Sequence, residues 1–209
     1  MAIIYDAVLK PTKLDLLTHW LPSQSWFDGD PAELELVGSF RFDDSNGEVG
    51  VETHLVRAGT KIFQAPLTYR GAPLEDAGEW LIGTMEHSVL GQRWVYDACG
   101  DPVYAAALAG TLLAGRPQAT QYLDNDGKLE ELPTSARIDV SGAPGNDMPE
   151  RNIAEPTTAG DVTTIKTGAE GLAINRVLDL SGKTTGTRIM TGTWDGNSTP
   201  VQLAWVPKA

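Results

Sequence analysis

Residues 34–69 constrain the fold of this 209-residue chain most, because apolar and polar side chains alternate along them and turn residues interrupt the pattern. ELELVGSFRF and EVGVETHLVRA are separated by DDSNG, and Gly59-Thr60 separates the second stretch from KIFQAPLTY. Alternation with a period of two is typical of strands, and Asp, Asn and Gly favour tight turns. The pattern predicts an antiparallel meander of three strands. His54 falls on the face opposite the apolar side chains, which predicts a solvent-facing or cross-strand histidine.

Two helices are predicted from their capping residues. Thr12 is followed three residues later by Asp15, which resembles a capping box, and leucines at helical spacing come next. Asp101 is suited to the N-cap of a second helix, with Pro102 at its first position and Gly115 as its C-terminal stop. Further strands are predicted over residues 2–9, 79–86 and 91–98.

The composition shifts toward Thr, Gly, Ser and Pro after residue 115. The segment 142–161 is rich in Pro, Gly and acidic residues, which predicts a mobile surface loop. The fold class expected is α+β, with a curved antiparallel sheet and one or two helices in residues 1–115. A second, mostly β lobe is expected in residues 116–209, with strands near 134–140, 162–167, 171–179, 187–194 and 200–206.

Charge and targeting signals limit the partners of the chain. It has 16 basic and 28 acidic residues, a net charge of −12, which repels both nucleic acid and anionic membranes. The start lacks a basic leader followed by an apolar run, and no stretch approaches the roughly 20 apolar residues of a membrane span. The single cysteine, Cys99, precludes an internal disulfide. We therefore expect an acidic cytoplasmic protein without nucleic-acid or membrane partners.

Common cofactor motifs are incomplete in this sequence. GKT at 182–184 lacks the upstream glycine of a phosphate loop, because Val177 occupies that position. DNDG at 124–127 lacks the first ligand of a calcium loop, where Tyr122 stands. The three histidines are isolated from one another and from any cysteine pair. No cofactor and no metal are therefore expected.

A short stretch that contains His87, Arg93, Asp97, Cys99 and Asp101 allows two interpretations, one catalytic and one structural. A nucleophile needs a base and an orienting group, which Cys99, His87 and Asp97 could supply, and Asp97 with Asp101 could act as paired carboxylates. This reading predicts a small enzyme. The structural reading is more specific: a strand ends at Asp97, a turn passes through Cys99, and Asp101 caps a helix.

Tryptophans suggest a third function, because their flat faces suit sugar rings. Of the six, Trp80 and Trp205 lie beside apolar neighbours typical of a core, whereas Trp26 lies in the polar loop SQSWFDGD. An α-glucan-binding module would use Trp26 or Trp94. The candidate ligand- or partner-binding residues are therefore Trp26, His87, Arg93, Trp94 and Asp97.

A family resemblance rests on PLTYRG at 66–71 and LIGTMEHSVLGQRWVYDACGDPVYAAAL at 81–108. These runs resemble the N-terminal cap of bacterial maltokinases, in which EHxxLGxRWVYD is followed by GDPVY and a helix. Residues 2–22 are compatible with the opening strand and helix of the same cap. The resemblance is specific over residues 1–115, and TTIKTGAEGLAINRVLDL at 163–180 resembles only the glycine-containing hairpin of a kinase upper lobe.

The resemblance implies a fold and a metabolic context rather than a reaction. Maltokinases depend on a kinase core with a strand lysine, a catalytic-loop aspartate after a histidine, and a metal-binding aspartate, and none of these can be placed on this chain. A cap without a kinase core implies a non-catalytic cytoplasmic accessory or binding protein. Its implied partners are a protein of α-glucan metabolism (glycogen, maltose or trehalose) or a small carbohydrate, with the enzyme and α-glucan-binding readings as alternatives.

Overall fold

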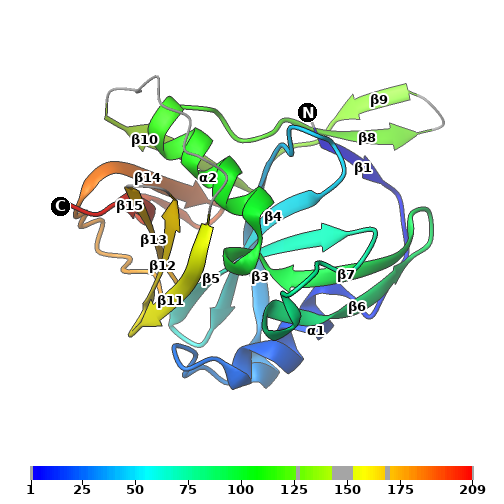
Figure 1. The fold of residues 1–209 in the computed structure, drawn as a ribbon, viewed down its shortest axis with the longest axis horizontal. Coiled ribbons are helices and arrows are strands. Elements are labelled where there is room, and N and C mark those ends of the chain that lie inside the picture. Colours follow the sequence, from blue (N-terminus) through cyan, green and yellow to red (C-terminus); the bar gives the residue numbers. More distant parts are fainter. Residues whose placement is uncertain (1, 126–127, 143–152, 168–169, 209) are drawn as a thin grey trace.

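The computed structural model describes the chain except residues 1, 126–127, 143–152, 168–169 and 209. Its described strands form two six-stranded sheets and one three-stranded sheet. Two α-helices accompany them, so the fold is α+β and mostly β, as predicted, with a curved antiparallel sheet (Figure 1). No helix in the described part of the chain is long and apolar enough to cross a membrane.

The N-terminal sheet has the strand order β2-β6-β7-β5-β4-β3, and all its pairings are antiparallel. The predicted meander is confirmed, because β3, β4 and β5 follow one another as neighbours. The strands span Leu9–Lys10 (β2), Glu35–Phe42 (β3), Gly50–Ala58 (β4), Lys61–Arg70 (β5), Leu81–His87 (β6) and Gly91–Asp97 (β7).

Both faces of the N-terminal sheet are covered, which corrects the solvent-facing alternative predicted for His54 and leaves the cross-strand one. Leu55 packs in the core that contains the second helix, whereas Val56 packs in the core that contains the first helix. His54 lies on the face of Val56, as the alternation requires, but its side chain is only 2% exposed. Alternation identified the face correctly and could not reveal that a second layer covers it.

The helices begin and end where their capping residues predict. Helix α1 (Lys13–Trp20) has Thr12 as its N-cap, and Thr12 and Asp15 form the reciprocal bonds of a capping box. Helix α2 (Pro102–Ala114) is capped by Asp101, and Gly115 ends it in the left-handed conformation at φ 68°. Short 3-10 helices occupy Leu21–Ser23 (η1), Pro31–Glu33 (η2), Gly78–Trp80 (η3) and Ala98–Gly100 (η4).

The C-terminal sheet has the order β10-β14-β15-β13-β12-β11. One of its strands corrects a prediction, because β11 lies within the segment 142–161 that was expected to be a loop; residues 143–152 of that segment lie outside the described residues. Pro156 is tolerated because β11 is an edge strand with a register shift there. The strands are Ala136–Ser141 (β10), Ile153–Ala159 (β11), Val162–Thr167 (β12), Glu170–Asn175 (β13), Thr187–Trp194 (β14) and Asn197–Val206 (β15).

A three-stranded arm completes the fold. It consists of β1 (Ala2–Tyr5), β8 (Gln121–Asn125) and β9 (Lys128–Glu131), and β1 pairs in parallel with β8. The strand predicted over 2–9 is therefore interrupted after Tyr5 and resumes as β2 in a different sheet. The arm extends along one side of the N-terminal sheet (Figure 1).

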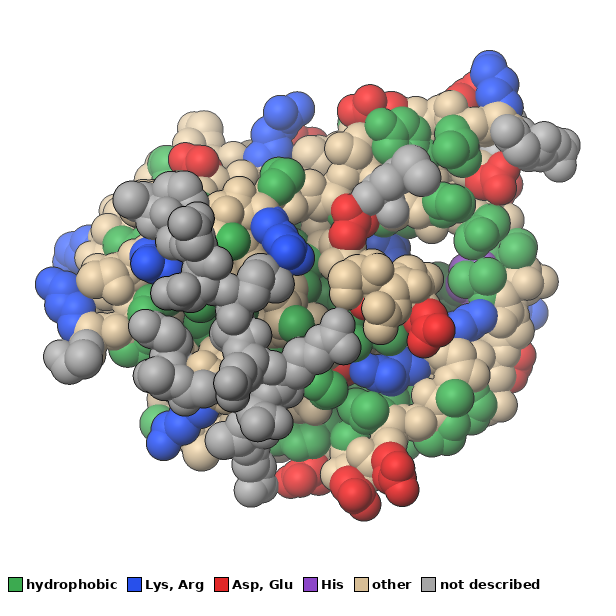
Figure 2. Space-filling view, turned by 45° about the horizontal axis from the view of Figure 1, so that its top comes forward, with side chains coloured by type: hydrophobic (Ala, Val, Ile, Leu, Met, Phe, Trp, Pro, Cys, Tyr) green, Lys and Arg blue, Asp and Glu red, His purple; other side chains and the backbone are tan. Residues whose placement is uncertain are grey.

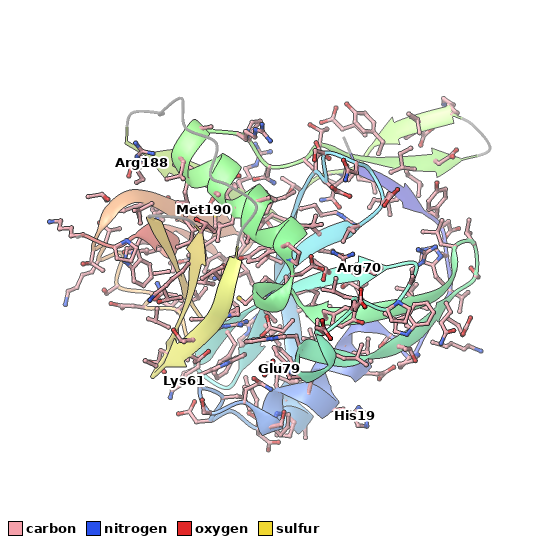
Figure 3. All side chains as sticks on the ribbon, viewed as in Figure 1. His19, Lys61, Arg70, Glu79, Arg188 and Met190 are labelled. Atoms are coloured by element: carbon pink, nitrogen blue, oxygen red, sulfur yellow. The ribbon has the colours of Figure 1, made fainter. Side chains whose placement is uncertain are left out.

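One hydrophobic core joins the two halves of the chain. Helix α2 packs between the two large sheets, so that Leu108 shares a cluster with Leu55 and with Met190 of β14 (Figure 3). A backbone hydrogen bond also links the two halves, because Gln64 of β5 donates its N–H to the carbonyl of Arg176 at 2.8 Å. The division into lobes 1–115 and 116–209 stays a prediction, and the lobes pack as one body.

Candidate functional site

A cleft of about 610 Å³ lies between the arm and the α1 side of the N-terminal sheet. Figure 2 shows the molecule hollowed beside the arm, with a histidine and Lys or Arg side chains at the wall. Its residues come from α1, from strands β1 to β7 and from the loops at their ends. Its polar and aromatic members include Tyr5, Lys13, Arg41, Glu52, Tyr69, His87 and Arg93.

A buried carboxylate lies at the floor of the cleft. Glu52 is 4% exposed, and its Oε2 lies 2.6 Å from Nζ of Lys13 and 3.5 Å from Nη1 of Arg41. Burial raises the pKa of Glu52, but its cationic neighbours outweigh burial and hold the pKa well below its usual range. Glu52 is therefore ionised at neutral pH.

His54 and Tyr69 continue this polar network beneath Glu52. Nε2 of His54 lies 2.9 Å from the Tyr69 hydroxyl and 3.7 Å from Oε2 of Glu52. Burial is the main cause that lowers the pKa of His54 to about 4. The charge of Glu52 acts to raise this pKa, whereas the charges of Lys13 and Arg41 act to lower it. His54 is therefore neutral at pH 7, and Lys13 and Arg41 balance the charge of Glu52. Burial and the Glu52 charge raise the pKa of Tyr69, which keeps the phenol protonated.

His87 and Arg93 form the opposite end of the cleft. Nδ1 of His87 accepts backbone N–H bonds from Val89 at 3.3 Å and Leu90 at 3.1 Å, so the proton of the neutral ring is on Nε2. Arg93 donates from Nη2 to the carbonyl of Leu90, and the Tyr5 ring meets the His87 ring edge-on at 6.2 Å. Burial, Arg93 and Lys13 lower the pKa of His87.

The structure places the other predicted site residues away from this cleft. Asp97 and Trp26 lie around Arg176, whose Nη2 is 2.6 Å from the Asp97 carboxylate and whose guanidinium is 5.1 Å from the Trp26 ring centroid. Trp26 is only 4% exposed and lies in the core, so its ring has no free face for a sugar. Trp94 is partly buried on the opposite face of β7 from Arg93.

His87 lies far from the other residues of the predicted small enzyme site, although the backbone N–H of Cys99 donates to the Asp97 carboxylate at 3.1 Å. His87 pairs with Gly91 at one end of β7, and Asp97 lies six residues further along, a separation of about 20 Å. Cys99 is fully buried, and burial raises the pKa of its thiol far above its usual value. The structure therefore does not support nucleophilic catalysis by Cys99 with His87 and Asp97.

Asp101 has the structural role that its sequence context predicts, and one further contact. Its carboxylate accepts the N–H of Val103 at 2.9 Å, as an N-cap does. Nε and Nη2 of Arg70 each lie 2.7 Å from it, and Thr68 also donates to it at 2.7 Å. Arg70 lies where β5 approaches the start of α2 (Figure 3). All acceptor capacity of Asp101 is thus used to hold the helix on the sheet.

Sequence reasoning predicted His87 and Arg93 and missed the rest of the cleft. Glu52, Lys13 and Arg41 were not singled out, because they come from separate elements that meet only in the folded chain. One signal could have identified Glu52: it lies two residues from His54, on a strand face that continues with the apolar residues Val56 and Ala58. Polar residues on a covered face of a strand are costly unless they are bonded. Among the described residues, no three His, Cys, Asp or Glu side chains gather as a metal site.

The sequence of this region matches a known domain. The maltokinase N-terminal cap domain matches residues 20–101, which include β3 to β7 and the turn before α2. Residues 20–101 resemble that cap domain. No curated protein matches the chain. The matched region supplies Glu52, His87 and Arg93 to the cleft, whereas Lys13 and β1 lie outside it.

Proposed function

We propose that this chain is a non-catalytic binding protein whose cleft holds a small carbohydrate. The observation that carries the proposal is the ionised Glu52 at the floor of a concave site. Lys13, Arg41 and His54 all approach the same oxygen of Glu52, Oε2. None of these contacts involves the other oxygen, Oε1, and we assign to it the hydrogen bond from a sugar hydroxyl. A few fixed polar groups in a partly apolar cleft are typical of small-molecule sites.

The ionisation states of the cleft support binding rather than catalysis. Glu52 is held ionised by Lys13, so it is a poor general acid, and His54 is buried and neutral. General acid–base catalysis works best when the pKa lies near the operating pH, and the pKa values of these two groups lie well below neutrality. The floor of the cleft is therefore suited to fixing a ligand rather than to moving its protons.

The resemblance to the maltokinase cap suggests the class of carbohydrate. Maltokinases act on maltose, as their name says, so maltose and longer α-glucans are the first ligands to test. This link to α-glucan metabolism rests on the resemblance, and a shared fold does not by itself establish a shared function.

Titration calorimetry with maltose tests the proposal. We expect saturable binding by the wild-type protein and affinity about tenfold weaker for Glu52→Gln, which loses the charge of the acceptor. Glu35→Gln is the matched control, because Glu35 is an exposed carboxylate of the same sheet that pairs with Arg57. Circular dichroism verifies the fold of both variants. Absence of binding to maltose and to longer α-glucans would refute the carbohydrate proposal.

A partner protein is a second candidate, favoured by exposed apolar side chains that neighbour the cleft-lining residues Leu9 and Leu90 in the chain. Val8 is 62% exposed and Val89 is 55% exposed, and the two segments are bonded through Ser88 and Val8. Exposed apolar residues that gather in one place are typical of interaction sites. Affinity capture with a Val8→Ser/Val89→Ser variant as the control tests this candidate: a partner captured equally by both proteins would not bind at this surface.

A further inference from the structure

Arg93 is a cation of the cleft that lacks an acidic partner. Among the described residues, no carboxylate lies within ion-pair distance of its guanidinium. Its Nε is buried and has no hydrogen-bond partner, and its Nη2 is bonded to the backbone carbonyl of Leu90. Polar groups that are buried without a partner are rare in proteins, and a missing ion is one of their explanations.

The guanidinium of Arg93 also lies close to the backbone at Gly71. A Cβ at Gly71 would lie 2.9 Å from Nη1 of Arg93, so the absence of a side chain there leaves the space that the guanidinium fills. The carbonyl of Leu90 holds the other terminal nitrogen. A planar cation fixed on two sides is suited to a carboxylate or a phosphate, which it recognises through its fork of N–H groups.

His87 adds a second donor beside Arg93. Arg93 pairs with Met85 of β6, and His87 lies two residues further on the same face of that strand. Because Nδ1 of His87 is occupied by backbone N–H groups, its Nε2 carries the proton and can donate. Both side chains line the cleft. The site therefore has a guanidinium and an imidazole N–H from neighbouring strands.

The acidic residues of the cleft lie at a different part of its wall. Asp44 and Glu48 belong to the turn between β3 and β4, and the Asp44 carboxylate accepts the backbone N–H groups of Asn46, Glu48 and Val49 at 3.0 Å each. In the strand order, β7 is two positions from β4, a separation of about 10 Å between their backbones. Arg93 and His87 therefore lie apart from the carboxylates of the β3–β4 turn.

We propose that Arg93 and His87 form a subsite for an anionic group of the bound ligand, a phosphate monoester or a carboxylate. The proposal rests on the proposed function, because it assigns the ligand class of the same cleft. It extends that function from a neutral sugar to a sugar that carries one negative group. The anion lies against Arg93 and His87, and the sugar hydroxyls face Glu52.

Nuclear magnetic resonance titration at pH 7 and low salt tests this subsite. The probes are maltose, glucose, glucose 6-phosphate, glucuronate and inorganic phosphate. We expect glucose 6-phosphate or glucuronate to bind at least about tenfold more tightly than glucose, because hydrogen bonds to a charged group are stronger than those between neutral groups. The ring resonances of His87 should move, and those of His19, which points away from the molecule (Figure 3), should not. Preference for one of the two anionic sugars identifies the group as phosphate or carboxylate.

Three variants test whether Arg93 causes the preference for the anionic sugars over glucose. Arg93→Gln should remove the preference for the anionic sugar over glucose. Gly71→Ala keeps the charge and displaces the guanidinium, so it should weaken the preference as well. Arg57→Gln is the matched control, because Arg57 is an exposed arginine of the same sheet that pairs with Glu35. Denaturant unfolding verifies that each variant is folded.

The outcomes separate the subsite from the proposed function. If maltose binds and the anionic sugars bind no better than glucose, or if the preference persists in Arg93→Gln, the anion subsite is refuted and the carbohydrate proposal stands. If inorganic phosphate shifts His87 in an Arg93-dependent manner and no sugar binds, the subsite stands and the carbohydrate proposal fails. If no probe binds, both are refuted.

Discussion

Acidification from pH 6.5 toward pH 4 should destabilise the protein through His54. The pKa of His54 is lowered from 6.5 to about 4 in the folded protein, chiefly by burial. Below pH 6.5 His54 is protonated in the unfolded chain but stays neutral in the folded chain. The free energy of unfolding therefore falls as the pH falls toward 4. The difference between the two pKa values corresponds to about 3 kcal/mol. That is a large fraction of the 5–15 kcal/mol typical of a domain.

Urea denaturation at a series of pH values between 7 and 4 measures this loss. We expect the free energy of unfolding of the wild type to fall by about 3 kcal/mol more than that of His54→Gln, whose side chain cannot titrate. His19→Gln, an exposed histidine of α1, is the matched control and should behave like the wild type. Below pH 4.5 the loss should continue, because the pKa of Glu52 is also lowered in the folded state. Parallel pH profiles for the wild type and His54→Gln would refute the reasoning.

Two further predictions concern buried groups away from the cleft. Arg176→Met should cost about 3–5 kcal/mol in urea unfolding, because it leaves the Asp97 carboxylate buried without its partner, and the Asp97→Leu/Arg176→Met double variant should be more stable than either single variant; additive losses would contradict this coupling. The Cys99 thiol, buried and with its pKa raised, should react with a thiol reagent only in denaturant; rapid labelling of the native protein would show that the site opens.

Local sequence signals predicted the parts of the fold that neighbouring residues determine. Thr12 with Asp15, and Asp101 with Val103, form their capping bonds within three residues, so the sequence contains both partners of each bond. The residue types alone therefore predict where α1 and α2 begin. The alternation of β4 likewise predicts which side chains share a face, since it depends on strand geometry alone.

Burial and long-range partners could not be predicted in the same way. Trp26 occurs in a polar loop but is covered by Trp20, Phe63 and Arg176. Arg176 comes from a segment far along the chain from Asp97. The sequence around Asp97 therefore does not indicate that the two residues form an ion pair. Arg93 and His87 were predicted because they lie close in the sequence. The unpartnered Nε of Arg93 is a property of the folded sheet.

The parallel pairing of β1 with β8 determines at which stage of folding the cleft forms. Ala2 pairs with Gln121, so the whole N-terminal sheet and α2 lie within the loop that this pairing closes. Closing so long a loop costs entropy that is repaid only after the intervening elements have formed. The wall of the cleft formed by β1 is therefore assembled late in folding. A ligand that contacts both this wall and the sheet would bind the completed fold and not its precursors, and would thereby stabilise the arm at the two ends of that long loop.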